Sequence, residues 1–470
     1  MTRKDSIVPH ILAYAVMKAF PSSKLIGGGS TPLNFFYNIR FDFEFSSDAL
    51  HSIEEALCSF LANPKTMKIM EMIPANAQEL LSHHKQEVRG EVAEESGDQF
   101  ANVLRIGDFY DYIGLISSDK IEFNHAKIVE WSVVGSWMDK PIIQIVGVGA
   151  DTKPNMIAKQ KMLKKALKGR HDVLGEKMGL FYIDESNEVF WHSRGQALRR
   201  LLIDEWYERV EKMGVEIIST PGLRPFSKRF DDYQKINPKC RRLAEIGSVE
   251  RYANQADALF AGGVVRGDLI RFVGSKETLE GDLKAALDMI CAFWTDCNLT
   301  KGDCVYVDFQ TLLDHEQEIE LQAADVFGRP QKISSLRLKE LKKGLFELNI
   351  RVFWSMSSFI ALIIEKNKGG LPFFLEPIQI DIAVLKRSLM AEAEQIKINF
   401  EQNGVRVRIY SHNIKQKHEA MALSKSSHAP FFFTLFEEGK GYVLERGNKK
   451  FDTVDVKDFI KSVLKDAKKS

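Results

Sequence analysis

The sequence has few cysteines, no long apolar run and no dominant charge. Its five cysteines include no C-x-x-C pair, which excludes a zinc ribbon and predicts reduced thiols. No apolar run reaches the roughly 18 residues of a membrane-spanning helix, and MTRKDSIVPH at the N-terminus has no secretory apolar core. The 65 Lys+Arg and 64 Asp+Glu residues leave a net charge of +1, so nucleic-acid contacts must be local. We therefore expect a cytoplasmic protein without membrane contact.

What is present is a chain of ordinary globular composition, with 470 residues of which 44% are hydrophobic. This length allows several domains, each with its own core. Residues 1–152 have an α+β pattern, with an amphipathic helix over 8–20, a strand over 35–45 and a strand ending near 150. Residues 153–185 predict a basic connecting helix, for which a solvated connector is favoured over a nucleic-acid contact.

The second half of the chain predicts two further domains. Residues 186–370 mix helices and strands, including a long amphipathic helix over 196–213 and strands over 304–309 and 350–354. Residues 371–470 alternate in the order β-α-β-α-β-β-α, which is typical of a compact α/β domain. The predicted fold class is therefore a multidomain protein that combines α+β and α/β parts.

Several stretches, taken in order along the chain, resemble threonyl-tRNA synthetase, a class II aminoacyl-tRNA synthetase. Two resemble parts of its editing domain: HILAYAVMKAFPSSK and VLRIGDFYDYIGLISS. Five resemble its catalytic domain from the approach to motif 1 through motif 3: GRHDVLGEKMGLFYIDE, FWHSRGQALRRLLIDEWYERVEKMG, RRLAEIGSVERY, IELQAADVFGRPQKISSLRL and VFWSMSSFIALIIE. Three resemble its anticodon-binding domain: LPFFLEPIQIDIAVL, NGVRVRIY and HAPFFFTLFEE.

The resemblance implies four segments. These are an editing-like domain (1–152), a basic connecting helix (153–185), a class II catalytic-like domain with an antiparallel sheet (186–370) and an anticodon-binding-like domain (371–470). The family's small N-terminal ubiquitin-like domain has no counterpart in this sequence. We interpret the chain as a degenerate paralogue because the family's catalytic, zinc-binding and editing positions, described next, are substituted together.

The positions that carry the family's activation chemistry differ here. Class II enzymes stabilise charge on the α-phosphate of ATP with one arginine from motif 2 and one from motif 3. Arg251 matches the first, but the expected glutamate two residues later is Ala253. The Glu-Arg pair of motif 3 is replaced by Ser357 and Ser358, and serine cannot supply a guanidinium charge. The resemblance therefore implies no catalytic residues.

The pocket could still hold an anion. Three arginines are candidates for a residual nucleotide or anion site: Arg251, Arg266 and Arg329.

The family's zinc site is also missing from the sequence. Family members select threonine with a zinc ion held by one cysteine and two histidines. The segment that would carry the cysteine is shortened, since only about thirty residues separate Pro221 from Arg251. The first histidine falls near Ile270 and Arg271, and the second near Asn349. We therefore expect no bound metal, no zinc cofactor and no support for ATP–Mg²⁺ binding.

Editing in the family uses a His-x-x-x-His pair and a later Cys-x-x-x-His. The corresponding residues here are Ser6, His10, Ile113 and Ser117, which keep one of four. His10 is thus an editing remnant, which we interpret as a helix-cap or surface histidine. No deacylase activity is expected.

The C-terminal domain keeps its pattern and holds 17 Lys+Arg against 13 Asp+Glu residues, a local excess of 4 positive charges. The phenylalanines of PFFF favour a core role over stacking on bases. Five basic residues lie on or beside the strand and turn where the family reads anticodon bases, although solvated charges are an equal alternative: Arg406, Arg408, Lys415, Lys417 and Arg446.

The resulting hypothesis is a threonyl-tRNA synthetase-like protein that is inactive in aminoacylation and editing and acts as a tRNA-binding, regulatory or partner-binding paralogue. The 196–213 helix predicts a homodimer, because class II enzymes pair there and its apolar face is kept (Leu198, Leu201, Leu202, Trp206); a heterodimer with an active synthetase is also open. Two alternatives stay open. They are an active threonine–tRNA ligase and an enzyme that uses a remodelled class II pocket on another substrate.

Overall fold

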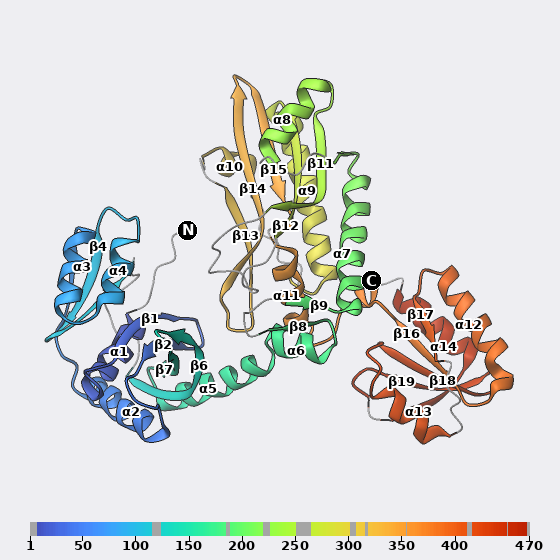
Figure 1. The fold of residues 1–470 in the computed structure, drawn as a ribbon. Coiled ribbons are helices and arrows are strands. Elements are labelled where there is room, and N and C mark those ends of the chain that lie inside the picture. The colour runs from blue at the N-terminus through green and yellow to red at the C-terminus, as the bar shows by residue number, and fades with distance from the viewer. Residues whose placement is uncertain are drawn as a thin grey trace. The chain divides into compact units, whose positions relative to one another are not determined.

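The computed structural model describes residues 7–114, 124–184, 189–219, 226–250, 265–300, 307–314, 318–353, 355–410, 416–448 and 450–467. The chain divides into two compact units (Figure 1). Unit 1 contains residues 1–168 together with 326–329, and unit 2 contains residues 169–325 together with 330–470. Each unit is described separately below.

Unit 1 has a four-stranded antiparallel sheet in the order β1-β2-β7-β6 and a three-stranded sheet in the order β3-β4-β5. The strands are β1 (Lys24–Ser30), β2 (Phe35–Arg40), β3 (Met67–Met72), β4 (Ala101–Ile106), β5 (Phe109–Ile113), β6 (His125–Trp137) and β7 (Lys140–Ala150). The helices are α1 (Val8–Ala19), α2 (Ser47–Ala62), α3 (Pro74–His83), α4 (Glu87–Glu94) and α5 (Lys153–Lys168).

Helix α1 forms the centre of unit 1. Pro9 lies in its first turn, where a missing N–H costs no helical hydrogen bond, and Pro21 follows its end. Every residue from Val8 to Val16 is buried, because the helix packs between α2 and the strands of unit 1. Residues 8–20 were predicted as one amphipathic helix. The structure confirms the helix but buries it on all sides.

Helix α5 covers part of the predicted basic connecting helix and belongs to unit 1. Met156 and Leu163 pack on Val146 and Val148 of β7. The helix ends at Lys168, so the predicted single helix over 153–185 is two helices, the second being α6 (His171–Lys177) in unit 2. The four-segment division of the chain stays a prediction.

Unit 2 has a six-stranded sheet in the order β10-β11-β12-β15-β14-β13, in which only the β10–β11 pair is parallel. Its strands are β10 (Glu216–Ile217), β11 (Arg242–Glu250), β12 (Val265–Gly274), β13 (Ile319–Ala324), β14 (Pro330–Lys342) and β15 (Leu345–Arg351). The strand pair β8 (Phe181–Ile183) and β9 (Val189–Trp191) precedes the sheet in the sequence. The helices that accompany the sheet are α7 (Ser193–Lys212), α8 (Phe226–Ile236), α9 (Lys276–Asp296) and α10 (Phe309–Asp314).

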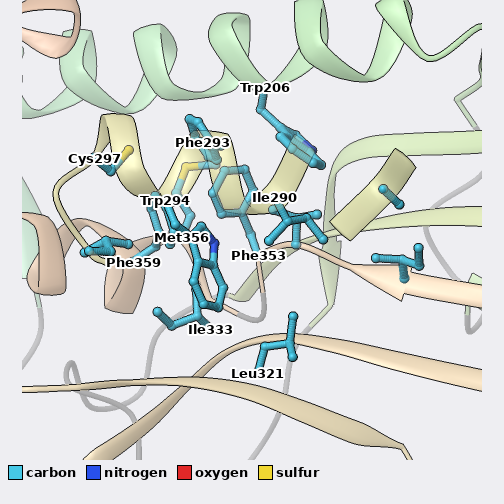
Figure 2. Close-up of a cluster of buried hydrophobic side chains, with 14 of the residues drawn as sticks. Trp206, Ile290, Phe293, Trp294, Cys297, Leu321, Ile333, Phe353, Met356 and Phe359 are labelled. Carbon is cyan, nitrogen blue, oxygen red and sulfur yellow. The ribbon is translucent and has the colours of Figure 1, made fainter. Parts of the chain in front are cut away.

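Aromatic side chains fill the space between this sheet and its helices (Figure 2). Trp206 of α7 lies 5.6 Å from Phe293 of α9 and 5.7 Å from Phe353, measured between ring centroids. Phe359, which lies on α11 (Met356–Lys366), stacks on Phe293 at 5.6 Å. This core joins the segment that resembles motif 3 to the two long helices.

The rest of unit 2 is an α/β part with a five-stranded sheet in the order β17-β16-β18-β19-β20. Its strands are β16 (Ile380–Val384), β17 (Val407–Ile409), β18 (Phe431–Glu437), β19 (Lys440–Glu445) and β20 (Asp452–Asp455). Its helices are η1 (Phe373–Leu375), η2 (Arg387–Leu389), α12 (Met390–Gln402), α13 (Lys417–Ser424) and α14 (Val456–Ala467). Every residue of β16 is buried, because apolar clusters pack on both faces of the sheet.

The predicted element order of residues 371–470 is confirmed, and β20 is an additional strand that the sequence pattern did not indicate. Phe432 and Phe433 lie in the two apolar clusters, so the core interpretation of PFFF is also confirmed for them. Of the predicted strand over 304–309, residues 304–306 lie outside the described residues, Val307 and Asp308 belong to no strand, and Phe309 begins helix α10. Cys291 is disulfide-bonded, so the expectation of reduced thiols is wrong at this position. Within the described ranges, no helix is both long and apolar enough to span a bilayer.

Candidate functional site

The turn between β15 and α11 holds the residues that resemble motif 3. Strand β15 ends at Arg351 and α11 begins at Met356, so the predicted strand-to-helix transition is confirmed. The turn is anchored by Asp268, whose Oδ1 accepts hydrogen bonds from the N–H groups of Val352 (3.0 Å) and Phe353 (2.8 Å). Sequence reasoning missed this anchor, although a carboxylate inside the apolar strand RGDLIRFV was a signal for it.

Asp268 is 1% exposed. Burial raises the pKa of its carboxyl to about 6, although the two backbone N–H groups favour the ionised form. The indole of Trp206 favours the ionised form too, but among the described residues neither Asp268 Oδ2 nor Trp206 Nε1 has a hydrogen-bond partner of good geometry. The carboxyl therefore holds the turn in place with one oxygen, and its charge is costly there.

Ser358 lies in the first turn of α11 and is 7% exposed. Its backbone N–H donates to Ser355 Oγ at 3.2 Å, so Ser355 caps the helix. On either side, Met356 and Phe359 are buried in the aromatic core. At the position where the resemblance expects an arginine, the chain thus has a small, neutral and largely buried side chain.

A buried arginine, Arg271, lies in the region where the resemblance places the family's zinc site. Arg271 on β12 lies opposite Asn349 on β15 and donates from Nε to its Oδ1 at 3.1 Å. Its Nη1 lies 2.6 Å from Asp231 Oδ1 and 3.3 Å from Glu347 Oε2, and the ring of Phe230 lies 5.2 Å away. A guanidinium has five donors and no acceptor, so it cannot bind a metal ion. The arginine itself supplies the positive charge at this place.

Cys240 lies at the other end of the same region, between α8 and β11. Its Sγ donates to Glu216 Oε2 at 2.9 Å, and Tyr233 donates to Glu216 Oε1 at 2.6 Å. Burial and the Glu216 carboxylate raise the pKa of the Cys240 thiol to about 11. A thiol that stays protonated near pH 7 is a poor metal ligand. Among the described residues, no cluster of three or more His, Cys, Asp or Glu side chains has metal-binding geometry.

The three arginines proposed for a residual anion site cannot be joined into one site here. Arg251 and Ala253 lie outside the described residues. Arg266 is on β12 of unit 2, where only its backbone pairing with Val249 is described. Arg329 belongs to unit 1, and its guanidinium lies 5.2 Å from the ring of Phe327. The anion site stays a prediction.

In unit 1, His10 is not a helix cap or a surface residue, so that interpretation is wrong. It is 4% exposed, and its Nδ1 lies 2.5 Å from Asp111 Oδ2. Tyr37 donates to the same oxygen at 2.6 Å, and Arg89 donates from Nε to Asp111 Oδ1 at 2.8 Å. His10, which the sequence predicts to be an editing remnant, is therefore part of a buried polar network. Ser6 and Ser117 lie outside the described residues.

This network is strongly polarised. Burial opposes the charge on Asp111, but Arg89 and His10 outweigh it and lower the pKa of Asp111 to about 2. Burial raises the pKa of Tyr37 well above its usual value. Arg89 also donates to the backbone carbonyls of Tyr112 (2.6 Å) and Ile26 (3.3 Å). The carboxylate and guanidinium thus have several partners each, which is how buried charges are tolerated.

Most of the basic residues proposed to contact tRNA make contacts inside unit 2. Arg406 donates to the backbone carbonyls of Phe374 and Glu376, and Arg408 makes two 2.7 Å hydrogen bonds to Asp381. Arg446 Nη1 lies 2.5 Å from Glu376 Oε1. Lys417 is exposed, with its Nζ 3.9 Å from the centre of the Tyr442 ring, and Lys415 lies outside the described residues.

The apolar face of α7 faces the core of its own unit. Leu198, Leu202 and Trp206 are fully buried there, and Leu201 is partly buried against the same cluster. The face cited for homodimer formation is therefore already covered. The dimer stays a prediction that rests on the resemblance alone.

The first comparison with known proteins concerns the fold. The chain shares its fold with the solved RNA-binding domain of threonyl-tRNA synthetase from Cryptosporidium parvum Iowa II, with a TM-score of 0.51 and 16% identity over 64% of this chain and 98% of that one. The mixed α+β architecture of the chain is thus a fold that it shares with that solved domain.

The particular relationship comes from sequence. The chain is 22% identical to the threonine–tRNA ligase of Clostridium acetobutylicum over 96% of its own length and 86% of that ligase. It is also 22% identical to the enzyme of Clostridium tetani, over 86% of this chain and 78% of the ligase. No family model matches the chain. The protein is a divergent threonyl-tRNA synthetase-like protein.

Proposed function

We propose that this protein is a threonyl-tRNA synthetase-like paralogue that neither activates threonine nor edits tRNA, and that it acts by binding tRNA. The proposal that the protein does not activate threonine rests on the turn between β15 and α11, which resembles motif 3. There the buried Ser358 replaces the expected arginine, and its backbone is held by the Ser355 cap. Losing one preorganised donor to a developing charge costs roughly 10²–10³ in rate, and a full charge costs at least as much.

The contacts of Arg271 with Asn349, Asp231 and Glu347 support the same proposal, because they bear on how the substrate would be selected. In the family, a zinc ion selects threonine by binding its amine and its hydroxyl group. Binding these two groups requires an electrophilic centre with free coordination positions. Arg271 directs its donors to Asn349, Asp231 and Glu347 instead. We propose that zinc does not bind and that the pocket does not distinguish threonine from valine.

The buried network around Asp111 supports the absence of editing. A catalytic histidine must reach a bound ester, whereas His10 is 4% exposed and pairs with Asp111. We therefore assign His10 a structural role in unit 1.

The proposed tRNA contacts lie on two surfaces. One is the outer face of α5, where Lys161, Lys164, Lys165 and Lys168 are exposed while Met156 and Leu163 face the unit. The other is the C-terminal α/β part, where Lys417 is exposed. The solved relative described as an RNA-binding domain supports this choice, since it shares the fold of 64% of the chain. Phosphate contacts of this kind weaken steeply with salt.

The first test is threonine-dependent exchange between ATP and pyrophosphate, run beside an active threonine–tRNA ligase. We expect no exchange above a control without protein. Exchange that is clear of that background would overturn the inactive assignment and favour the ligase alternative.

The second test is tRNA binding over a salt series. The variant Lys164→Gln with Lys165→Gln should reduce the slope of log K against log salt by roughly 0.9–1.8, because each lost phosphate contact contributes about 0.9. The matched control is Lys68→Gln with Lys127→Gln, two exposed lysines elsewhere in unit 1, which should leave the slope unchanged. If the unaltered protein binds no tRNA at low salt, the tRNA role is refuted and partner binding becomes the leading function.

A further inference from the structure

A cavity of about 260 Å³ in unit 2 lies apart from the motif 3 turn. Its walls come from α6, the start of α7, the turn after α11 and the C-terminal α/β part. Its lining includes Lys177, Arg194, Lys368, His428 and Arg446. The proposed function assigns no role to these positions, although the sequence analysis named Arg446 as a candidate tRNA contact.

The two arginines of the cavity are fixed by one buried carboxylate. Arg194 Nη2 donates to Glu376 Oε2 at 2.8 Å, and Arg446 Nη1 lies 2.5 Å from Glu376 Oε1. Both guanidinium groups also donate to the backbone carbonyl of His428. Since Glu376 is fully buried, these contacts place the two charges rigidly.

The cavity has more positive than negative charge. Besides the two arginines, Lys177 and Lys368 line it, and neither lysine has an ion-pair partner among the described residues. Four permanent cations against the Glu376 carboxylate leave a local excess of three positive charges. Nearby, Arg408 and Asp381 neutralise each other.

His428 reports the same positive field. Burial lowers the pKa of its imidazole, and Arg194, Arg446 and Arg408 lower it further, while Asp381 has a small opposite effect. An anion in the cavity would offset these cations and make the protonated imidazole easier to form.

We propose that this cavity binds a small phosphate-bearing anion with at least two negative charges. Two fixed guanidinium groups and two flexible ammonium groups around one space match the several acceptor oxygens of a phosphate or polyphosphate. At about 260 Å³ the cavity lies just below the roughly 300–1,000 Å³ of sites for drug-sized ligands, which favours a compact ligand. Leu174 and Met178 form an apolar wall for its non-phosphate part.

The test uses pyrophosphate and inorganic phosphate with the full chain, by calorimetric titration at constant ionic strength. Pyrophosphate should bind more tightly than phosphate because it has more charge. The variant Lys177→Gln with Lys368→Gln should weaken pyrophosphate binding by about tenfold or more, since two charge-assisted contacts are lost. It leaves the Glu376 ion pairs intact. The control is Lys366→Gln, an exposed lysine on α11 outside the cavity, which should bind as the unaltered protein does.

A second readout does not depend on the lysines. Saturating pyrophosphate should raise the pKa of His428. This pKa is measured by titrating the imidazole resonances with pH in NMR spectra. No pyrophosphate binding at millimolar concentration, or binding that the double variant leaves unchanged, would overturn the proposal.

An additional experiment with tRNA distinguishes a small phosphate ligand from the phosphates of RNA. If a tRNA binds in a manner that the Lys177 and Lys368 changes weaken while pyrophosphate does not bind, the small-ligand proposal is wrong and the cavity belongs to the RNA surface. The test involves neither threonine nor α5. Its failure therefore leaves the proposed function standing, and failure of tRNA binding leaves this site standing.

Discussion

The Asp268 carboxyl that holds the motif 3 turn allows a quantitative prediction. Its pKa is about 6 in the folded chain against an ordinary value of 3.8, so the folded state binds the proton more tightly. Its contribution to stability is therefore full below about pH 3.8 and is lost as the pH rises through about 6. At 1.36 kcal/mol per pKa unit, the difference of about 2.2 units corresponds to about 3 kcal/mol.

The perturbation is Asp268→Asn. The amide keeps an oxygen for the N–H groups of Val352 and Phe353 but carries no charge at any pH. Its NH₂ group replaces an oxygen that has no partner among the described residues, which adds a cost of about 1–3 kcal/mol that does not depend on pH. The informative quantity is thus the change in relative stability between pH 3.5 and pH 8, and the variant should gain about 3 kcal/mol over that interval.

The assay is hydrogen exchange of the peptide covering β12, measured for both proteins from pH 3.5 to 8 and corrected for intrinsic rates. This readout follows unit 2 even if the two units unfold separately. Glu280→Gln, a half-exposed carboxylate on α9, serves as the control and should show no such gain. Parallel pH profiles for Asp268→Asn and the unaltered protein would refute the reasoning.

Three further predictions concern the other polar clusters. Asp111→Asn should destabilise unit 1 by about 3–5 kcal/mol in chemical denaturation, because it leaves Arg89 buried without its carboxylate. Replacing both residues, as Asp111→Leu with Arg89→Met, should cost less than the single change, and an equal cost would contradict the pairing. In the unaltered protein the Asp111 contribution should persist above pH 3.8 and be lost as the pH falls through about 2. Treatment with a chelator should leave the thermal midpoint unchanged because Arg271 supplies the local cation, and a lower midpoint would reveal a structural metal. Iodoacetamide should alkylate Cys240 slowly at pH 7.5, since its thiol has a pKa of about 11. The variant Glu216→Gln should accelerate the reaction, because it removes the carboxylate that accepts the hydrogen bond of the thiol. An alkylation rate equal to that of a free thiol would contradict this hydrogen bond.

Periodic patterns in the sequence predicted the local structure well. The alternation over 371–470 gave the correct order of strands and helices, because apolar spacing in a short window depends on the geometry of the element itself. Strand β20 was missed, since Asp452–Asp455 has no buried residue and its pairing with β19 is set by the sheet. The same limit applies to the break between α5 and α6, which depends on what each helix packs against.

Sequence reasoning failed where a residue's role depends on a distant partner. His10 was placed at the surface, but its carboxylate partner Asp111 is 101 residues away. The apolar face of α7 was assigned to a second subunit, whereas α9 and the motif 3 turn cover it within the same chain. A helix pattern identifies which side is apolar but not which surface covers it.

By itself, the sequence determined the similarity to threonyl-tRNA synthetases and the order of elements in the C-terminal part, and it predicts that Ser357 and Ser358 stand where the family has charged motif residues. Each of these is readable from residue identity and spacing along the chain. Only the tertiary structure decided which cations are paired, that Asp268 anchors the motif 3 turn, and that Arg271 meets Asn349 and Glu347 in one cluster. Such contacts join strands and turns far apart in sequence. They arise from sheet register and burial, which no local pattern encodes.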